Sequence, residues 1–190
     1  MVKKKTKNGS TPLIQAVSNI NEELVDLLLK SGANSNERLL DKTDALLMAC
    51  SEGNFNIVKS LVEYNANVNT IDSDGRSILL NTLMKPTTYL KPEQKKLHKE
   101  LISYLVDLPI DVNIKSKSNL SSIFIASYMR DKDTVLKLLD KGANADDSYL
   151  MDINVGKTSI LHLWCQAGDE EVVQKLLEKG AKLGLVNDEG

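Results

Sequence analysis

The fold is decided by residues 43–69, TDALLMACSEGNFNIVKSLVEYNANVN. Apolar residues recur there at helical spacing in two short runs, separated by Gly53. Asn54 follows the glycine and can cap the second helix by accepting hydrogen bonds from its free N–H groups. The apolar positions are Ala45, Leu46, Ala49 and Cys50, then Ile57, Val58, Leu61 and Val62. Two helices this short cannot bury their apolar faces alone, so they must stack on copies of themselves.

Copies of this unit follow one another at a fixed interval. The position of Leu47 recurs at Ile14 and Leu80, a spacing of 33 residues in both directions, which is the ankyrin period. Residues 11–16, TPLIQA, resemble the ankyrin box TPLHxA, with Ile14 in place of His. Residues 23–36 resemble the family's E-I-V, L-L-L and G-A-D-x-N elements. The chain is identified as a member of the ankyrin-repeat family. The resemblance implies an all-α solenoid of helix-turn-helix units with hairpin-like finger loops.

The repeat register predicts five repeats after a basic tail at residues 1–7. The reference position returns at Phe124 and His162. The first finger has Lys42 where the family has its turn glycine, so we expect that hairpin to be less regular. Residues 187–190 match the D-x-x-G turn of a sixth repeat, and we expect the sequence to be a fragment that breaks off there. The predicted repeats cover about residues 8–39, 40–71, 72–115, 116–153 and 154–186.

Repeat three carries an insertion, because Phe124 lies 44 residues after Leu80 rather than 33. We place the extra material at residues 84–96, MKPTTYLKPEQKK. Its prolines would break a helix, whereas the residues up to His98 favour a backward extension of the second helix. The insertion can belong to a binding face or be a tolerated polar excursion. Five further residues fall in the finger at 146–154, which we expect to be long and exposed.

Composition limits the functional classes. The chain has 190 residues, 42% hydrophobic and 4% aromatic, with a formal charge of −2. This charge gives no basic field for nucleic acid or anionic membrane. No apolar run reaches the roughly 20 residues of a membrane span, and the start lacks the apolar segment of a signal peptide. We expect a monomer in the cytoplasm. The Lys-rich tail leaves a nuclear signal open, and a secreted bacterial effector is a further alternative.

Catalytic and metal motifs do not hold together. Residues 156–158, GKT, lack the earlier glycine of a phosphate-binding loop, since Met151 stands there. His162 and Cys165 lie three apart, but a zinc site needs about four ligands. The carboxylates are scattered, with no acid/base pair singled out. We therefore predict no catalytic residue, no cofactor and no metal site.

Four residues of the first helices have a structural interpretation. Cys50 and Cys165 share a register position on the buried side, several layers apart, so we predict two buried free thiols rather than a disulfide. The resemblance implies that His162 bonds to backbone in the adjoining loops. Trp164 replaces the small alanine of the box, so it either fills a widened gap or lies at the edge of the stack.

The resemblance implies that partners dock on the finger loops and on the concave surface of the first helices. Several apolar residues stand at positions that the fold leaves open to solvent, in repeats three and four: Met84, Leu120, Tyr128 and Met129. Exposed apolar patches often mark interaction sites. The alternative is that the insertion folds back and covers them. The predicted partner-binding residues are Glu52, Met84, Lys85, Tyr128, Met129, Gln166, Asp74, Arg76 and Leu120.

The fingers suggest one modification. Some ankyrin proteins are substrates of an asparaginyl hydroxylase, and the resemblance implies candidate sites at Asn113 and Asn69, each with a Leu eight residues before it. The alternative is that these asparagines only fix the turn by hydrogen bonds.

Taken together, these features predict a non-catalytic protein-interaction module that binds a partner protein or peptide. The alternative is a regulatory or substrate-recruiting arm of a larger enzyme, effector or channel.

Overall fold

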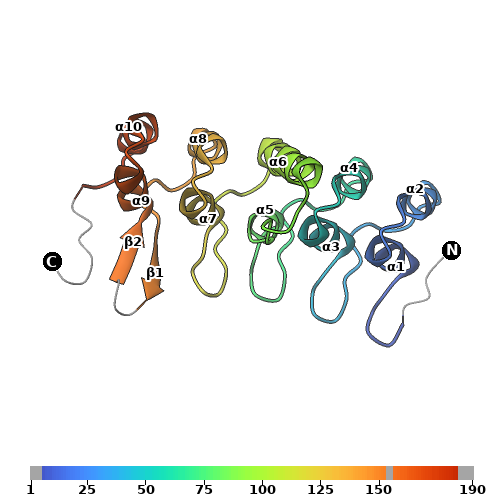
Figure 1. Ribbon diagram of the computed structural model, residues 1–190. Helices are drawn as coiled ribbons and strands as arrows, with labels where there is room; N and C mark the ends of the chain where they lie inside the picture. The colour runs from blue at the N-terminus through green and yellow to red at the C-terminus, as the bar shows by residue number, and fades with distance from the viewer. Residues whose placement is uncertain (1–5, 153–155, 184–190) are drawn as a thin grey trace. The chain divides into compact units, whose positions relative to one another are not determined.

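The computed structural model of the chain describes residues 6–152 and 156–183 (Figure 1). The chain divides into two compact units, residues 1–110 and 111–190, and each is described by itself. The basic tail up to Lys5 and the turn motif at residues 187–190 lie outside the described residues.

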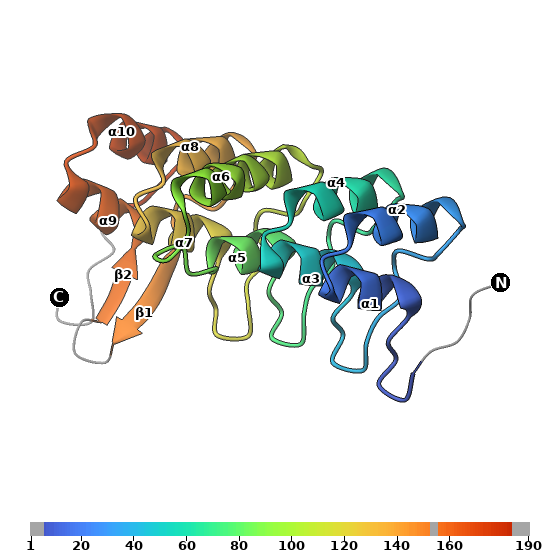
Figure 2. The same ribbon diagram turned by 45° about the vertical axis from the view of Figure 1, so that its right-hand side comes forward.

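The first unit consists of three helix pairs. The first helix of each pair packs against the first helix of the next, and the second helices do the same, so the unit has two rows of helices (Figures 1 and 2). This stacking of short pairs is what the 33-residue period predicts. The helices are α1 (Pro12–Ser18), α2 (Glu22–Lys30), α3 (Ala45–Glu52), α4 (Phe55–Glu63), α5 (Ile78–Leu83) and α6 (Pro92–Asp107).

The second unit contains two further helix pairs and a small sheet. In it α7 packs on α9, and α8 packs on α10. Strands β1 and β2 pair antiparallel with an irregularity between Leu150 and Asp152. The helices are α7 (Ser122–Tyr128), α8 (Lys132–Asp140), α9 (Ile160–Ala167) and α10 (Glu170–Glu178), and the strands are β1 (Ser148–Asp152) and β2 (Gly156–Ser159). The all-α prediction holds for both units, apart from this sheet.

Each first helix starts at a side chain that caps it. The capping oxygen accepts a hydrogen bond from the backbone N–H three residues later, which satisfies one of the free donors of the first turn. The caps are Thr11, Asp44, Ser77, Ser121 and Ser159. Between α3 and α4 the chain turns at Gly53, whose φ of 69° lies in the left-handed region that glycine tolerates best.

The core of each unit is aliphatic and rich in alanine. Ala16 and Ala49 are at most 1% exposed, and such small residues let adjacent first helices approach closely. Phe124 in the second unit is among the largest fully buried side chains. Its ring centroid lies 5.4 Å from that of Tyr149 on β1, so the sheet contributes an aromatic contact to this core.

The fingers are more regular than the sequence suggests. The first finger forms the bridge Arg38↔Asp44, the counterpart of Ile71↔Ser77 in the next repeat. Lys42 takes the left-handed conformation, with φ of 69°. The prediction of an irregular first finger is therefore wrong, because a lysine adopts the turn glycine's conformation there. In the longest finger Ser148 is 9% and Leu150 is 56% exposed, so that finger is exposed only in part.

The insertion of repeat three lengthens the second helix. Helix α6 has 16 residues and begins with Pro92 at its first position, where the missing N–H costs nothing. The predicted backward extension is confirmed. Residues 84–91 form the remaining linker, in which Tyr89 is 95% exposed.

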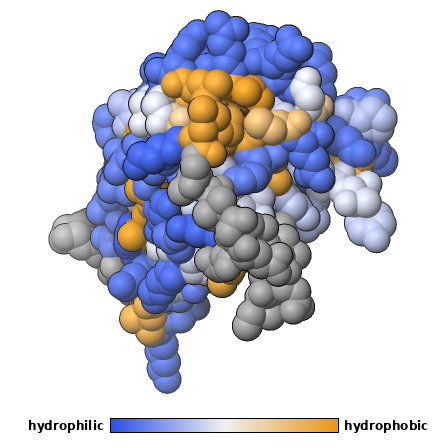
Figure 3. All heavy atoms as spheres, turned by 90° about the vertical axis from the view of Figure 1, so that its left-hand side faces the viewer, coloured by the Kyte–Doolittle hydropathy of each residue, from blue (hydrophilic) through white to orange (hydrophobic). Residues whose placement is uncertain are grey.

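The two cysteines differ in exposure. Cys50 is fully buried where α5 packs on α3, and this burial raises the pKa of its thiol to about 12. Cys165 is exposed, so the prediction of two buried thiols is wrong for it. The described residues contain no helix pair beyond α9 and α10 that could cover this side. Figure 3 shows hydrophobic residues gathered on that end of the second unit, where Leu177 is 41% exposed.

Trp164 is buried, with 2% of its surface exposed. The guanidinium carbon of Arg130 lies 5.9 Å from the centroid of its ring. Arg130 also donates a hydrogen bond to the backbone carbonyl of Leu163. Of the two alternatives for Trp164, the edge of the stack is therefore excluded, and the indole fills space beside α7.

Candidate functional site

The C-terminal ends of the first helices form an exposed row of side chains in each unit. The residues that occupy equivalent positions at these helix ends in each repeat are exposed, apart from the half-buried Lys85. They are Ser18, Asn19, Ser51, Glu52 and Met84 in the first unit, and Tyr128, Met129, Gln166 and Ala167 in the second.

The structure brings Glu52 and Lys85 together. The Lys85 ammonium donates to the carbonyl oxygens of Ser51 at 3.1 Å and Glu52 at 2.6 Å, and lies 3.9 Å from the Glu52 carboxylate. It thereby satisfies carbonyl groups at the C-terminus of α3, where a cation also interacts well with the helix dipole. Met84, the C-cap of α5, is 41% exposed. The linker that follows Met84 does not cover it.

Tyr128 and Met129 end α7 with two apolar side chains in solvent. They are 55% and 47% exposed, respectively. Arg130 follows them in the left-handed conformation, which turns the chain sharply into α8. Gln166 is exposed on α9 of the same unit. An exposed Tyr–Met pair offers apolar area that a protein partner can bury.

The predicted finger residues differ in their surroundings. Asp74 and Arg76 form an ion pair at 3.0 Å on the surface of the first unit. Leu120 is only 9% exposed, so its prediction as an open contact residue is wrong. Asn119 adopts a left-handed φ of 63° and closes the turn, and the Leu120 N–H donates to the Ser116 hydroxyl at 3.1 Å. This turn directs the leucine into the buried side of the hairpin.

The finger asparagines connect successive loops. Asn113 donates to the Gly142 carbonyl at 3.0 Å and accepts from the Asn144 N–H at 2.9 Å. Asn36 makes the same two bonds in the first repeats, and Asn69 donates to the Pro109 carbonyl at 3.2 Å. These bonds give the side chains a structural role between repeats. Hydroxylation of Asn113 and Asn69 stays a prediction, which an added oxygen in a mass spectrum would test.

Two buried carboxylates also hold the fingers. Asp44 caps α3, accepts a hydrogen bond from the Thr70 hydroxyl and pairs with Arg38 at 3.5 Å. Asp147 in the second unit accepts from Ser121 and pairs with Lys115. Sequence reasoning missed both networks. The signal was a cation six residues before the helix cap of each network, Arg38 before Asp44 and Lys115 before Ser121.

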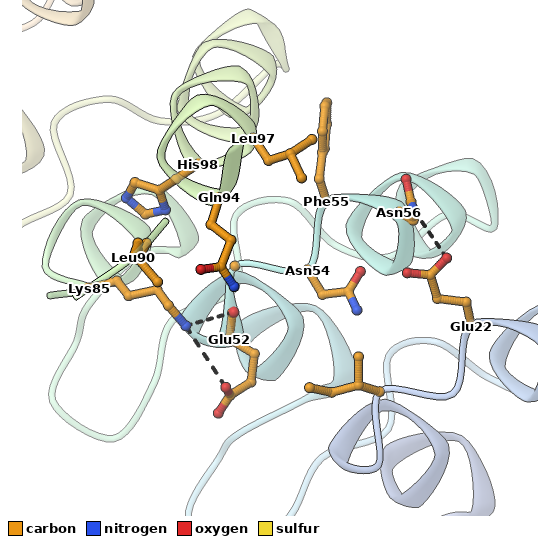
Figure 4. Close-up of a pocket in the computed structure, with 12 residues that line it drawn as sticks. Glu22, Glu52, Asn54, Phe55, Asn56, Lys85, Leu90, Gln94, Leu97 and His98 are labelled. Carbon is orange, nitrogen blue, oxygen red and sulfur yellow. Dashed lines mark hydrogen bonds and ion pairs between the residues drawn. The ribbon is translucent and has the colours of Figure 1, made fainter. Parts of the chain in front are cut away.

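A pocket of about 330 Å³ lies beside the linker of the first unit (Figure 4). Its walls come from the turns between paired helices and from the start of α6. Figure 4 shows Leu97 beside Phe55, and the Gln94 amide reaching into the space between Lys85 and Asn54. The lining residues are Ile20, Glu22, Glu52, Gly53, Asn54, Phe55, Asn56, Lys85, Leu90, Gln94, Leu97 and His98.

A sequence profile described as ankyrin repeats in three copies matches residues 1–72 and 94–187. The chain belongs to the ankyrin-repeat family. The unmatched residues 73–93 include α5 and most of the insertion, and two residues of the pocket lining, Lys85 and Leu90, come from this segment.

Relatives and solved structures agree with this assignment. The chain is 29% identical to human transient receptor potential cation channel subfamily A member 1, an alignment that covers 84% of this chain and 16% of the channel. It is 29% identical to the probable E3 ubiquitin-protein ligase XBOS32 of rice, over 92% of this chain and 32% of the ligase. A crystal structure of an ankyrin repeat domain from Acinetobacter baumannii gives a TM-score of 0.70 at 21% identity, covering 96% of this chain and 87% of that domain. The chain thus spans less than a third of these two curated relatives.

Ankyrin repeats serve as protein–protein interaction modules, and their fold is not itself catalytic. In the described residues, no group of three His, Cys, Asp or Glu side chains is placed to hold a metal ion. His162 is exposed, and its Nδ1 lies 2.7 Å from the hydroxyl of the capping Ser159. A separate search of the same residues finds no helix of the length and apolarity needed to cross a bilayer.

Proposed function

We propose that this ankyrin-repeat chain binds a partner polypeptide through the exposed ends of its first helices, with Tyr128 and Met129 as the main contact. The observation that carries the proposal is their exposure of 55% and 47%, side by side at the end of α7. Burying such side chains in a partner contributes about 25 cal/mol per Å² of apolar area. Tyrosine also supplies a hydroxyl for a hydrogen bond at the rim of the contact.

The proposed role is non-catalytic. A second candidate is the recruiting arm of a larger protein, and it is favoured by the matched relatives, a cation channel and an E3 ligase of which the alignments cover 16% and 32%. Both candidates need a partner surface, so the same variants address them. A cytoplasmic or nuclear location and a monomeric state stay predictions.

The test is affinity capture from cell lysate with the unmodified chain and with the Tyr128→Ser/Met129→Ser double variant. Leu40→Ser is a suitable control, since Leu40 is 79% exposed on the first finger, away from the helix ends. We expect the control to retain the captured proteins, and the double variant to lose at least one of them. Circular dichroism and urea unfolding must show that all three chains fold equally.

Equal capture by all three chains would refute the proposal, because the exposed pair would then contribute nothing to binding. Loss of the same protein by both variants would indicate nonspecific apolar adsorption. A partner that depends only on the Tyr128–Met129 pair would identify the pathway in which the chain acts.

A further inference from the structure

We propose that the pocket beside the linker of the first unit binds an arginine side chain of a partner polypeptide. This site shares Glu52 and Lys85 with the exposed helix ends of the proposed function, but it does not include its main contact, Tyr128 and Met129, because its lining lies in residues 20–98. It extends the binding role to a defined chemical group. The support comes from the shape of the pocket, its charges and its unused polar atoms.

The pocket has an apolar side. Ile20 and Leu97 are 53% and 50% exposed, and Phe55 and Leu90 are half-buried. A volume of about 330 Å³ exceeds that of a single side chain and lies at the lower end of the range for ligand sites. The three methylene groups of an arginine can lie against these apolar residues while its charged end stays near polar groups.

The lining carries a formal excess of negative charge. Glu22 and Glu52 contribute two carboxylates, against the single ammonium of Lys85. That ammonium is already held by the carbonyls at the end of α3. The backbone there also carries the negative end of the helix dipole. The pocket thus already holds one cation, Lys85, at the end of α3. The Glu22 carboxylate has no cationic partner among the described residues.

Glu22 has an oxygen left for a ligand. Its Oε2 accepts a hydrogen bond from the Asn56 amide at 3.0 Å, and its Oε1 has no partner among the described residues. The amide oxygen of Asn56 is a second open acceptor. A guanidinium group presents several N–H donors in one plane, so it can bond the free Glu22 oxygen and keep donors for further acceptors, which a lysine ammonium does less well.

Other ligand groups fit less well. A purely aliphatic side chain would cover the carboxylate of Glu22 without offering it a donor, and a desolvated charge without a partner is costly. An acidic side chain would be repelled by Glu22 and Glu52. Lys59 is not among the lining residues, and its ammonium lies over the Phe55 ring, 4.1 Å from the centroid.

The test uses N-acetylarginine N-methylamide as the probe and backbone amide NMR shifts as the readout. We expect saturable shifts in the millimolar range, centred on the turn Gly53–Asn54 and on the first turn of α6. The same titration with N-acetylnorleucine N-methylamide, which has an aliphatic chain without a charge, should give at least threefold weaker binding. N-acetylglutamate N-methylamide should not bind.

Glu22→Gln should weaken binding of the arginine probe by about three- to tenfold, since it removes the unpaired charge and keeps the side-chain shape. Glu23→Gln is the matched control, because Glu23 is the exposed neighbour on α2 and does not line the pocket. It should leave the affinity within twofold.

Three outcomes would overturn the proposal: no saturable shifts with arginine, equal binding of the norleucine probe, or equal effects of the two glutamine variants. These experiments change neither Tyr128 nor Met129, so their failure can be distinguished from failure of the proposed function. Unchanged spectra of both variants without probe would show that neither substitution disturbs the fold.

Discussion

Replacing Asp44 by alanine should destabilise the first unit strongly, although the residue belongs to no proposed binding surface. The side chain is buried, with 5% of its surface exposed. One carboxylate oxygen accepts from the Leu47 N–H at 2.9 Å, and the other accepts from Thr70 and pairs with Arg38. Alanine removes all three interactions at once.

The expected cost can be worked out from the three parts. Losing the helix cap costs about 1 kcal/mol. The Thr70 hydroxyl is 1% exposed and would lose its acceptor, which costs about 1–3 kcal/mol for a buried donor. The Arg38 side chain is 36% exposed, so the ion pair adds at most about 1 kcal/mol. Because the three share one carboxylate they do not add independently, and about 2–4 kcal/mol is expected.

The assay is urea unfolding monitored by circular dichroism. The free energies of unfolding are compared between chains whose free energy depends on urea concentration with the same slope. Asp41→Ala is the matched control, since Asp41 is exposed and makes one bond, to the Thr43 N–H at 2.9 Å. Its cost should stay below about 1 kcal/mol. Asp44→Asn keeps the side-chain shape and one acceptor oxygen, so its cost in free energy of unfolding should lie between those of Asp44→Ala and Asp41→Ala.

The interpretation of Asp44 would be refuted if Asp44→Ala cost less than about 0.5 kcal/mol, or no more than Asp41→Ala. Either result would mean that water replaces the carboxylate in the finger. A cost of Asp44→Asn equal to that of Asp44→Ala would instead assign the whole effect to the charge.

Three further predictions concern other parts of the chain. A thiol reagent should modify Cys165 at once but Cys50 only on unfolding, because Cys50 is buried with a pKa near 12; two fast thiols would contradict this. The ion pair with Lys175 holds the pKa of Asp140 below 3.8, so it stabilises the fold above that pH and is lost as the pH falls through the folded-state pKa. When the pH is lowered from about 5 to about 3, the free energy of unfolding of Asp140→Asn should therefore fall less than that of the natural chain, and equal falls would disprove the pair's role. Asn113→Ala should lower the free energy of unfolding by about 1–2 kcal/mol, since it removes both bonds to the next loop; an unchanged urea midpoint would exclude that role.

Much of the fold could be predicted because it depends on local and periodic features. The spacing of Ile14, Leu47 and Leu80 identified the repeats, and the structure forms helix pairs at these positions. The extension of α6 also follows from local propensity, with Pro92 at the start and helix formers after it. Each of these features needs only a few neighbouring residues, so the sequence is sufficient to predict it.

The errors concern burial, which depends on the neighbouring layer. Cys50 and Cys165 have the same register, yet α5 covers only the first. Leu120 was assigned to solvent by its finger position, but the left-handed turn at Asn119 directs it inward. A register predicts which side of an element a residue occupies, and not whether another element covers that side.

The sequence by itself determined the family, the repeat length, the helix pairs and the exposed Tyr128–Met129 pair, because these follow from periodicity and from the position of each residue within its helix. Only the tertiary structure decided the buried network of Asp44 and the pocket of the first unit. Asp44 meets Thr70 across 26 positions, and the pocket joins residues from Ile20 to His98. Such groups come together through the stacking of separate repeats, and no single stretch of sequence records which side chains will then be within hydrogen-bonding distance.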